Sequence, residues 1–454
     1  MKFLASSMCA LALAAACGDG DNAPVDDPDD PPPSDSARQF TMRIENVAPW
    51  HVLKLSSART RTTGAEGRLN PGDAYDIRFT AAEGHRLSFA MMMLDTNDWF
   101  FAPDPAGIPL FDNGVPLTGD ITDRIQLWDA GTEFDQEPAV GDATGIRQAS
   151  SITGDADPNN VVRLVPVTTT LSTGATFTRP EIAQMIQATL SGPDRDGLFT
   201  LHIQNVSTTG TLVTSIGTRA VHLSPVVWAL HRDGTPFFDA NMPVRANQID
   251  YLVEAGQPDP LIDSLRYERG VATGLSPGVF VIHRDDAPLF LVGAPDYGIG
   301  LEPLAEDGDP SVLYSAMREA SAGMFDTPVD GVSGPAFPGQ AYEVTFEAQP
   351  GDRVSFATMF ESSNDWFFAP KQAGIELFLG NDPRWGDVTS EVALYDLGTE
   401  SDQELDIGTA TAVHQTAPNT GGSDGIANVR EVPLRVYDVP EAYHIRVTLT
   451  PAEL

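Results

Sequence analysis

Apolar and polar residues alternate with a period of two in several short segments of the chain. The segment 75–79 (YDIRF) places three apolar side chains on one side and two polar ones on the other, and 342–346 (YEVTF) repeats this pattern. Similar alternation occurs at 87–89, 354–356 and 443–450. It is typical of antiparallel strands with one buried and one solvated face. We therefore predict an all-β protein made of antiparallel β-sandwiches with few short helices.

Internal repeats divide the chain further. Three pairs of segments match: 40–47 with 199–206, 71–92 with 338–359, and 127–137 with 394–404. From residue 70 to the Val-Arg pairs at 162–163 and 429–430 the offset is constant at 267, so this shared part has no insertions. Repetition on this scale indicates homologous units. We predict two tandem domains, 39–193 and 197–454, that meet at the turn-rich segment 191–197.

A second repeat lies between the matched parts of the predicted second domain. "LSPVVWALHRDGTPFF" (223–238) matches "LSPGVFVIHRDDAPLF" (275–290) at an offset of 52, and the similarity extends over 223–265 and 275–317. The prediction is therefore a shortened first sandwich that lacks this segment and a second sandwich in which it is duplicated. Residues 311–321, after Pro310, are one of the few candidates for a helix.

Composition and charge narrow the possible functions. The 454 residues are 41% hydrophobic, enough for two or three cores, and the 40 glycines and 36 prolines favour turns and short strands over long helices. The formal net charge is −37, from 64 acidic and 27 basic residues. So negative a chain repels nucleic acid and anionic lipid and attracts cations. We expect no nucleic-acid partner.

The N-terminal residues predict export and anchoring. Residues 1–16 combine Lys2 with a short apolar run that ends in small residues, as in an export signal. "LAAAC" resembles the lipobox of bacterial lipoproteins, which implies cleavage before Cys17 and lipidation of Cys17; a plain secretory signal with an incidental cysteine is the alternative. Gly18 follows, where an inner-membrane retention signal would have Asp, so we expect an outer-membrane or cell-surface address. Residues 17–38 are Asp- and Pro-rich and predict an extended linker.

Three long segments together resemble a known family. They are "LSPGVFVIHRDDAPLF" (275–290), "PGQAYEVTFEAQPGDRVSFATMFESSNDWFFAP" (338–370) and "DVTSEVALYDLGTESDQE" (387–404). In order and spacing they are similar to the spondin N-terminal domain of F-spondin and mindin, which also occurs in bacterial secreted proteins. The resemblance implies an antiparallel β-sandwich that carries a calcium ion at one end. It also implies a role in adhesion rather than catalysis.

The family's calcium ligands can be placed on this chain residue by residue. The Asp of the family's Asp-Trp pair falls on Asp98 and Asp365, and the first acidic residue of its Trp-Asp-Ala-Gly-Thr-Asp loop falls on Asp129 and Asp396. The second acidic residue of that loop falls on Glu133 and Glu400, where animal members have Asp. Carboxylates, carbonyls and water are the oxygen ligands that calcium prefers. The alternative is that Asp129 and Asp396 only hydrogen-bond their own turns.

Other candidate sites are weaker. "GLSPG" (274–278) fits the pattern of a hydrolase nucleophile elbow, but Pro277 has no N–H to donate to an oxyanion. His231 and His283 end apolar runs, where we expect a histidine held by a hydrogen bond. The consecutive aromatics 99–101 and 366–368 are expected to pack in cores or under loops, with an exposed platform as the alternative.

These observations predict a non-enzymatic, surface-anchored, calcium-binding adhesion or interaction protein. Its partner would be an extracellular protein or glycan, and it would contact the membrane only through the lipid on Cys17. The alternative is an envelope-associated hydrolase that uses clustered carboxylates on a glycan or peptide.

Overall fold

The structure is a computed structural model that describes residues 37–48, 52–148, 153–194, 197–266, 270–271, 273–284, 286–318, 321–432 and 444–452. The predicted signal peptide (1–16), the lipidation site Cys17 and all but the end of the predicted linker (17–38) lie outside the described residues. The described chain is mostly β-strand with short helices, which confirms the all-β prediction.

The described residues between 52 and 266 form one pair of sheets, which we call sandwich A. Its two main sheets have the strand orders β3-β15-β14-β9 and β11-β10-β5-β4-β18-β2, with β6 beside β4. The strands are β2 (Lys54–Ala58), β3 (Ala74–Thr80), β4 (Arg86–Met92), β5 (Trp99–Ala102), β6 (Ile108–Pro109), β7 (Phe111–Asp112), β8 (Val115–Pro116), β9 (Gly119–Asp120), β10 (Gln126–Asp129), β11 (Arg163–Leu164), β12 (Thr168–Thr170), β13 (Thr176–Thr178), β14 (Ile186–Ser191), β15 (Leu198–Asn205), β16 (Leu212–Thr214), β17 (Gly217–Arg219) and β18 (Val226–His231). The α-helices are α1 (Ile249–Ala255) and α2 (Asp259–Leu265).

Residues 37–48 together with the described residues between 270 and 452 form the other pair of sheets, sandwich B. Its main sheets have the orders β21-β1-β30-β27 and β20-β19-β22-β23-β28-β29, with β24 beside β22. The strands are β1 (Arg38–Asn46), β19 (Leu275–His283), β20 (Ala322–Phe325), β21 (Ala341–Ala348), β22 (Arg353–Phe360), β23 (Trp366–Pro370), β24 (Ile375–Glu376), β25 (Phe378–Leu379), β26 (Asp382–Pro383), β27 (Gly386–Asp387), β28 (Val392–Asp396), β29 (Arg430–Glu431) and β30 (Ile445–Pro451). The α-helices are α3 (Leu301–Asp307) and α4 (Ser311–Met317), and α4 confirms the helix predicted after Pro310.

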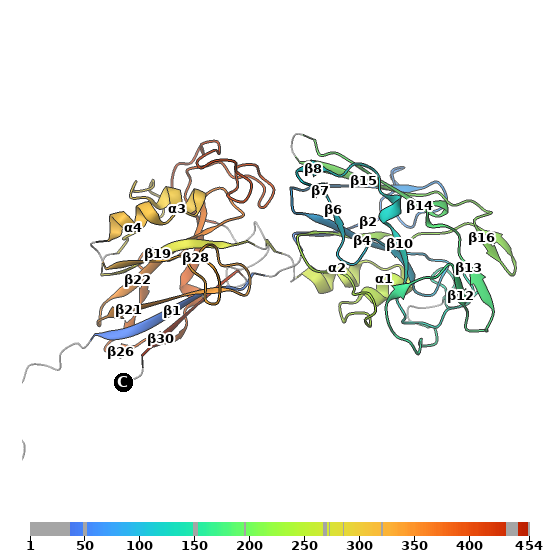
Figure 1. The fold of residues 1–454 in the computed structure, drawn as a ribbon, viewed down its shortest axis with the longest axis horizontal. Helices are drawn as coiled ribbons and strands as arrows, with labels where there is room; N and C mark the ends of the chain where they lie inside the picture. The colour runs from blue at the N-terminus through green and yellow to red at the C-terminus, as the bar shows by residue number, and fades with distance from the viewer. Residues whose placement is uncertain are drawn as a thin grey trace, which may run out of the picture. The chain divides into compact units, whose positions relative to one another are not determined.

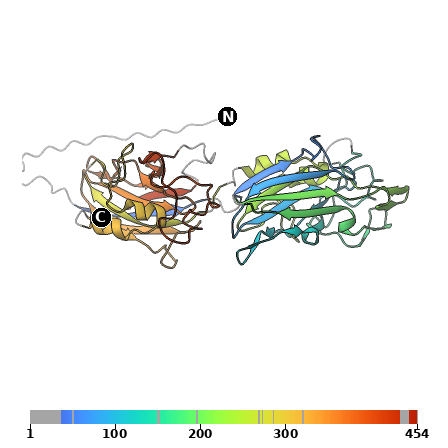
Figure 2. The same cartoon turned by 90° about the horizontal axis from the view of Figure 1, so that it is seen from above.

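Equivalent strands occupy the same places in the sheets of the two sandwiches, but they follow one another in a different order along the chain. Strand β1, at the start of the described chain, pairs with β21 and β30 in sandwich B, while its sequence twin β15 pairs with β3 and β14 in sandwich A. Figure 1 shows the blue strand β1 among the orange and red strands of sandwich B, and Figure 2 shows the same mixture of colours from above. Sandwich A is thus a circularly permuted copy, inserted after the first strand of sandwich B.

This arrangement corrects the predicted domain limits of 39–193 and 197–454. The segment 223–265 supplies β18 to sandwich A, between β4 and β2, and the segment 275–317 supplies β19 to sandwich B, between β22 and β20. Neither sandwich is shortened, and neither holds the segment twice. The prediction followed chain order because sequence similarity identifies equivalent strands but does not say which sheet a strand joins.

Two buried asparagines fix the ends of the exchanged strands. Asn46, at the end of β1, donates from Nδ2 to the carbonyls of Thr273 and Ala336, both at 2.8 Å. Asn205, at the end of β15, donates to the carbonyls of Leu69 and Val221 at 3.1 and 2.8 Å. Each asparagine therefore joins its strand to backbone of its own sandwich, and burying an amide requires such partners.

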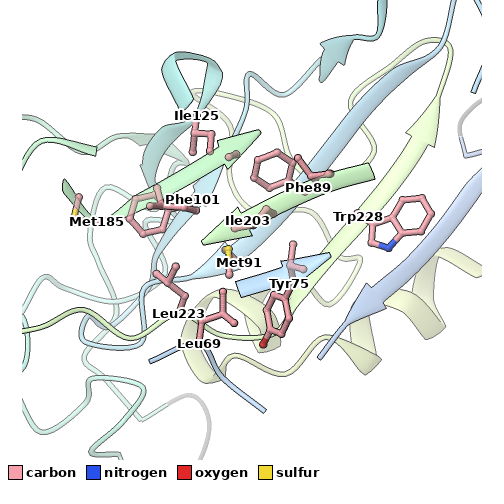
Figure 3. Close-up of a cluster of buried hydrophobic side chains, with 14 of the residues drawn as sticks. Leu69, Tyr75, Phe89, Met91, Phe101, Ile125, Met185, Ile203, Leu223 and Trp228 are labelled. Carbon is pink, nitrogen blue, oxygen red and sulfur yellow. The ribbon is translucent and has the colours of Figure 1, made fainter. Parts of the chain in front are cut away.

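Each sandwich buries apolar side chains on both faces of its larger sheet. In sandwich A, Trp99 and Phe101 of β5 point into the core between the sheets, and Phe100 points to the opposite face, where α1 and α2 cover it. Figure 3 shows Phe101 in that core beside Met91 and Ile203. Covering both faces explains why three consecutive aromatics can be buried, as we predicted, without forming an exposed platform.

Among the described residues, no helix is long and apolar enough to span a membrane.

The strand exchange can be tested with a matched pair of substitutions. Phe40 of β1 and Phe199 of β15 are equivalent core residues and are fully buried. We expect Phe40→Ala to destabilise sandwich B by about 3–5 kcal/mol and Phe199→Ala to destabilise sandwich A by a similar amount. Hydrogen exchange should accelerate in β21 and β30 for the first variant and in β3 and β14 for the second. If the domains were instead 39–193 and 197–454, Phe40→Ala would accelerate exchange in β3 and β14, and Phe199→Ala would accelerate it in β21 and β30.

Candidate metal centre

The fold brings three carboxylates together at one end of the larger sheet in sandwich A. Asp98 directly precedes β5, and Asp129 is the last residue of the neighbouring strand β10, where it pairs with Trp99. Asp135 lies in the loop that follows β10. One oxygen from each of the three carboxylates lies within 4.8 Å of the other two. We call these three residues the A cluster.

Asp98 is the buried centre of the A cluster. Its Oδ2 accepts hydrogen bonds from the backbone N–H of Thr132 (2.9 Å), the Thr132 hydroxyl (3.1 Å) and the backbone N–H of Glu133 (3.0 Å). Its side chain is fully buried, yet its Oδ1 has no hydrogen-bond partner among the described residues. An unpaired carboxylate oxygen in a protein interior is costly, and a cation would satisfy it.

Asp129 combines a turn-forming role with an ion pair. Its Oδ1 accepts the backbone N–H of Gly131 at 2.7 Å, which is the local turn bond that we gave as the alternative to metal binding. Its Oδ2 lies 2.5 Å from Nη2 of Arg163, and that same nitrogen lies 2.6 Å from Oδ2 of Asp157. The turn bond engages one oxygen only, so it does not exclude a role of Asp129 in the cluster.

The glycine of this turn is required by its surroundings. Gly131 has φ +69°, and a Cβ there would lie 2.4 Å from the carbonyl oxygen of Val161. Gly398 is in the same position in sandwich B, with φ +79° and the carbonyls of Ile426 and Asn428 at 2.7 Å from a Cβ. A side chain at either glycine would displace the loop that carries the third carboxylate.

Asp135 is held by the tryptophan of the repeated Asp-Trp pair. The indole Nε1 of Trp99 donates to Oδ1 of Asp135 at 2.6 Å, and the Thr169 hydroxyl lies 3.4 Å from Oδ2. Hydrogen bonds of this kind orient carboxylate ligands around a metal. Trp99 thus has a polar contact at the cluster in addition to its packing in the core.

Sandwich B repeats most of this geometry in the B cluster, Asp365, Asp396 and Asp402, although Asp402 is exposed where Asp135 is buried. Oδ2 of Asp365 accepts the N–H groups of Thr399 and Glu400 at 2.8 and 3.0 Å, and its buried Oδ1 is again without a partner among the described residues. The remaining contacts are Gly398 N–H to Asp396, Arg430 to Asp396 and Asp424, and Trp366 Nε1 to Asp402 at 2.7 Å. One sequence region thus builds the same cluster twice.

The third carboxylate differs from the predicted one. Glu133 and Glu400 are not members of the clusters; Asp135 and Asp402, two residues further along, take that place. Oε1 of Glu133 accepts the N–H of Gly154 at 2.5 Å and Oε2 accepts Asn97 Nδ2 at 3.3 Å, so Glu133 ties its loop to another loop. Glu400 makes the same bonds with Gly421 and Asn364. The prediction was made by aligning positions along the loop, and such spacing does not give the direction of a side chain. In the structure the side chains of Asp135 and Asp402, rather than those of Glu133 and Glu400, point into the clusters.

Asp135 and Asp402 had a signal in the sequence, since both repeats keep Asp-Gln-Glu at 135–137 and 402–404. Two further acidic residues were also missed. Glu254 of α1 and Glu306 of α3 occupy matching places in the repeats "LVEAGQP" and "LAEDGDP" and are buried beside the clusters. Burial raises the pKa of each to about 7, partly offset by hydrogen bonds with Thr132 and Thr399 respectively.

Burial and mutual repulsion also raise the pKa values of Asp98, Asp129 and Asp396. Burial raises the pKa of Asp98 to about 7, although the backbone N–H of Glu133 opposes the shift. The pKa of Asp129 rises to about 9 through burial and the charge of Asp98, and that of Asp396 rises to about 7 through burial and the charge of Asp365. Carboxylates confined in this way hold protons unless a cation replaces them.

The ligand atoms that both clusters offer suit a hard divalent cation. They are carboxylate oxygens, and no histidine or cysteine belongs to either cluster. Trp99 and Trp366 each orient one of the carboxylates through a hydrogen bond. Calcium prefers oxygen ligands, whereas zinc and copper sites use nitrogen and sulfur. The unpaired Oδ1 atoms of Asp98 and Asp365 supply an acceptor in each cluster that no protein donor uses among the described residues.

The other candidate residues have structural partners. Ser276, in the rejected nucleophile-elbow pattern, is buried; it accepts the N–H of Met359 and donates to the carbonyl of Pro277. His231 lies 2.9 Å from the Ser88 hydroxyl, and His283 lies 2.8 Å from the Ser355 hydroxyl. The prediction of histidines held by hydrogen bonds at strand ends is confirmed.

The raised pKa values predict how calcium and pH act together. The ordinary aspartate pKa is about 3.9, so protonated cluster carboxylates stabilise the calcium-free fold fully below about pH 4. This contribution is lost as pH rises through about 7 for Asp98 and Asp396 and about 9 for Asp129. We expect calcium to raise the unfolding midpoint more at pH 8 than at pH 5, because at pH 5 it competes with protons. Equal increments in scanning calorimetry at both pH values would contradict this.

Comparison with known proteins adds no assignment. No protein-family model matches the chain, and no curated protein matches it. The similarity to the spondin N-terminal domain therefore stays a prediction from the residues quoted above. Within the chain itself, two copies that diverge elsewhere keep three equivalent carboxylates, and the equivalent aspartates accept equivalent hydrogen bonds.

Proposed function

We propose that this protein is a calcium-binding interaction protein of spondin-like sandwiches, anchored at the cell surface through Cys17 and without enzymatic activity. The observation that carries the proposal is the pair of clusters in which Asp98 and Asp365 each bury a carboxylate oxygen that has no partner among the described residues. The predicted signal peptide and the lipobox-like "LAAAC" support export and anchoring.

Calcium acts as a structural brace in this proposal. The loop that follows β10 wraps around Asp98 through two backbone N–H groups and a hydroxyl, and its far end is held at the cluster by the bond from Trp99 to Asp135. A cation among the three carboxylates would cancel the repulsion that otherwise loosens this loop. The braced loops of sandwich A and of sandwich B would then present fixed surfaces to an extracellular protein or glycan.

Extracellular calcium modules bind with dissociation constants of about 10⁻⁴ to 10⁻³ M, which sets the useful calcium concentration at about 10 mM. At this concentration calcium is in tenfold to hundredfold excess over Kd, and a ligand that binds only the folded state then stabilises it by about 1.4 to 2.7 kcal/mol. We therefore expect 10 mM calcium to raise the unfolding midpoint of the wild-type protein well above its value in chelator.

The double variant Asp98→Asn and Asp365→Asn should lose most of this response, because the amides remove one carboxylate from each cluster. A matched control is Asp104→Asn with Asp382→Asn, which makes the same charge change at two exposed positions, one in each sandwich. The control should keep the wild-type response. A wild-type midpoint that does not respond to calcium, or a double variant that responds like the wild type, would overturn the proposal.

A further inference from the structure

Sandwich A contains a cavity that the metal proposal does not use. It has a volume of about 820 Å³ and lies between three segments: the loop 136–142, the hairpin β12–β13 and the hairpin β16–β17. Figure 1 shows β12, β13 and β16 gathered at one end of sandwich A. Ligand-binding sites in proteins commonly measure about 300–1,000 Å³, so the cavity is large enough for one or two side chains of a partner.

Specific contacts hold the walls of the cavity. The Glu137 carboxylate accepts the backbone N–H of Ser215 at 2.5 Å and the Ser215 hydroxyl at 2.6 Å, so the loop is joined to the β16–β17 hairpin. The N–H of Ser172 donates to the carbonyl of Asp135 at 2.7 Å. Phe177 packs against Trp99 with ring centroids 6.2 Å apart. The hairpin β12–β13 is therefore held by contacts with Asp135 and Trp99, and the hairpin β16–β17 is held by Glu137.

The lining has a definite chemistry. Apolar side chains of Val140, Leu171, Phe177 and Val213 alternate with hydroxyl groups and with the carboxylates of Glu137 and Asp142. None of the described residues that line the cavity is a lysine, arginine or histidine. Another cavity of sandwich A, of about 710 Å³ beside the hairpin β7–β8, differs because Arg124 lies in its lining together with Asp112.

This lining complements a basic side chain. The long aliphatic stem of lysine or arginine can pack on apolar side chains while its charged end meets carboxylates. An anionic group would meet two carboxylates and no cation, in a chain whose net charge is −37. A neutral sugar would gain nothing from this charge, so electrostatics favours the basic partner.

The hairpin β16–β17 forms one wall of the cavity. It follows β15 after residues 206–211 and pairs Leu212–Thr214 with Gly217–Arg219. Val213 and Ser215 of this hairpin belong to the lining.

We propose that this cavity binds a basic segment of a partner protein by taking up a lysine or arginine side chain. The proposal deepens the proposed interaction function, on which it rests, by giving the chemistry of the partner. Val213, which is 70% exposed on β16, is the residue best placed to test it, because it lines the cavity without a side-chain hydrogen bond.

The test uses the full chain and a fluorescein-labelled peptide that contains two lysines and two arginines among leucines and glycines. Binding is followed by fluorescence polarisation at about 0.15 M salt, where weak long-range attraction to the acidic surface is screened. We expect Val213→Lys to weaken binding about tenfold or more, because it places a like charge in the cavity. The matched control Val115→Lys introduces the same charge at a valine that is 65% exposed on β8 and should change binding less than about twofold.

The proposal would be overturned if the basic peptide did not bind, or if the two lysine variants lost peptide binding equally. It would also be overturned if calorimetry showed that the neutral sugar maltoheptaose binds in place of the peptide and that Val213→Lys weakens this binding. Asp142→Asn should also weaken peptide binding, since it removes one carboxylate from the lining.

Thermal unfolding in calcium and in chelator separates the cavity proposal from the calcium proposal. Calcium stabilisation without peptide binding would reject the cavity proposal only, and peptide binding without calcium stabilisation would reject the calcium proposal only.

Discussion

The structure depends most on a buried carboxylate that the protein satisfies only in part. In each sandwich an aspartate, Asp98 or Asp365, ends the turn between two central strands and accepts three hydrogen bonds on one oxygen. Those bonds hold the loop that follows β10 or β28 around this aspartate. The last residue of β10 or β28 supplies the second carboxylate, and the loop supplies the third. The remaining oxygen and the accumulated negative charge make the arrangement suited to a cation.

The surrounding residues reduce this charge without removing it. Arg163 pairs with Asp129 and Asp157, and Arg430 pairs with Asp396 and Asp424, so each arginine is shared between a cluster residue and a loop residue. In sandwich A, Arg163 brings one positive charge. The carboxylates of Asp98, Asp129, Asp135 and Asp157 bring four negative charges if all are ionised, so an excess of negative charge is left. A divalent cation would neutralise most of that excess, whereas protonation does so only below the raised pKa values of Asp98 and Asp129.

The sequence was a good guide to local structure and a poorer one to pairing. Period-two alternation located strands such as β3 and β21, and the constant offset identified the equivalent residues Asp98 and Asp365. It did not show that β1 joins β21 and β30, because hydrogen-bond pairing between distant segments leaves no local pattern. The same limit explains the choice of Glu133 over Asp135: loop spacing gives candidates, but only the turn at Gly131 and the bond from Trp99 decide which side chain points inward.

Nesting one sandwich within the other has a functional consequence. Both copies keep the carboxylate end of the sheet, so the proposed metal site is the shared property of the fold. Sandwich A also has the hairpin β16–β17, which forms one wall of the cavity that we propose binds a partner. Sandwich A therefore combines the common structural element with a feature that is able to serve one partner.

The most direct test of the central claim is sensitised luminescence of terbium, an ion that takes the oxygen ligands of calcium. The indoles of Trp99 and Trp366 bond to cluster carboxylates at 2.6 and 2.7 Å, close enough to transfer excitation energy to a bound lanthanide. We predict sensitised emission that saturates at two ions per chain, one for each cluster, and that falls when calcium is added. Emission that never rises above that of free terbium, or that calcium does not displace, would contradict it.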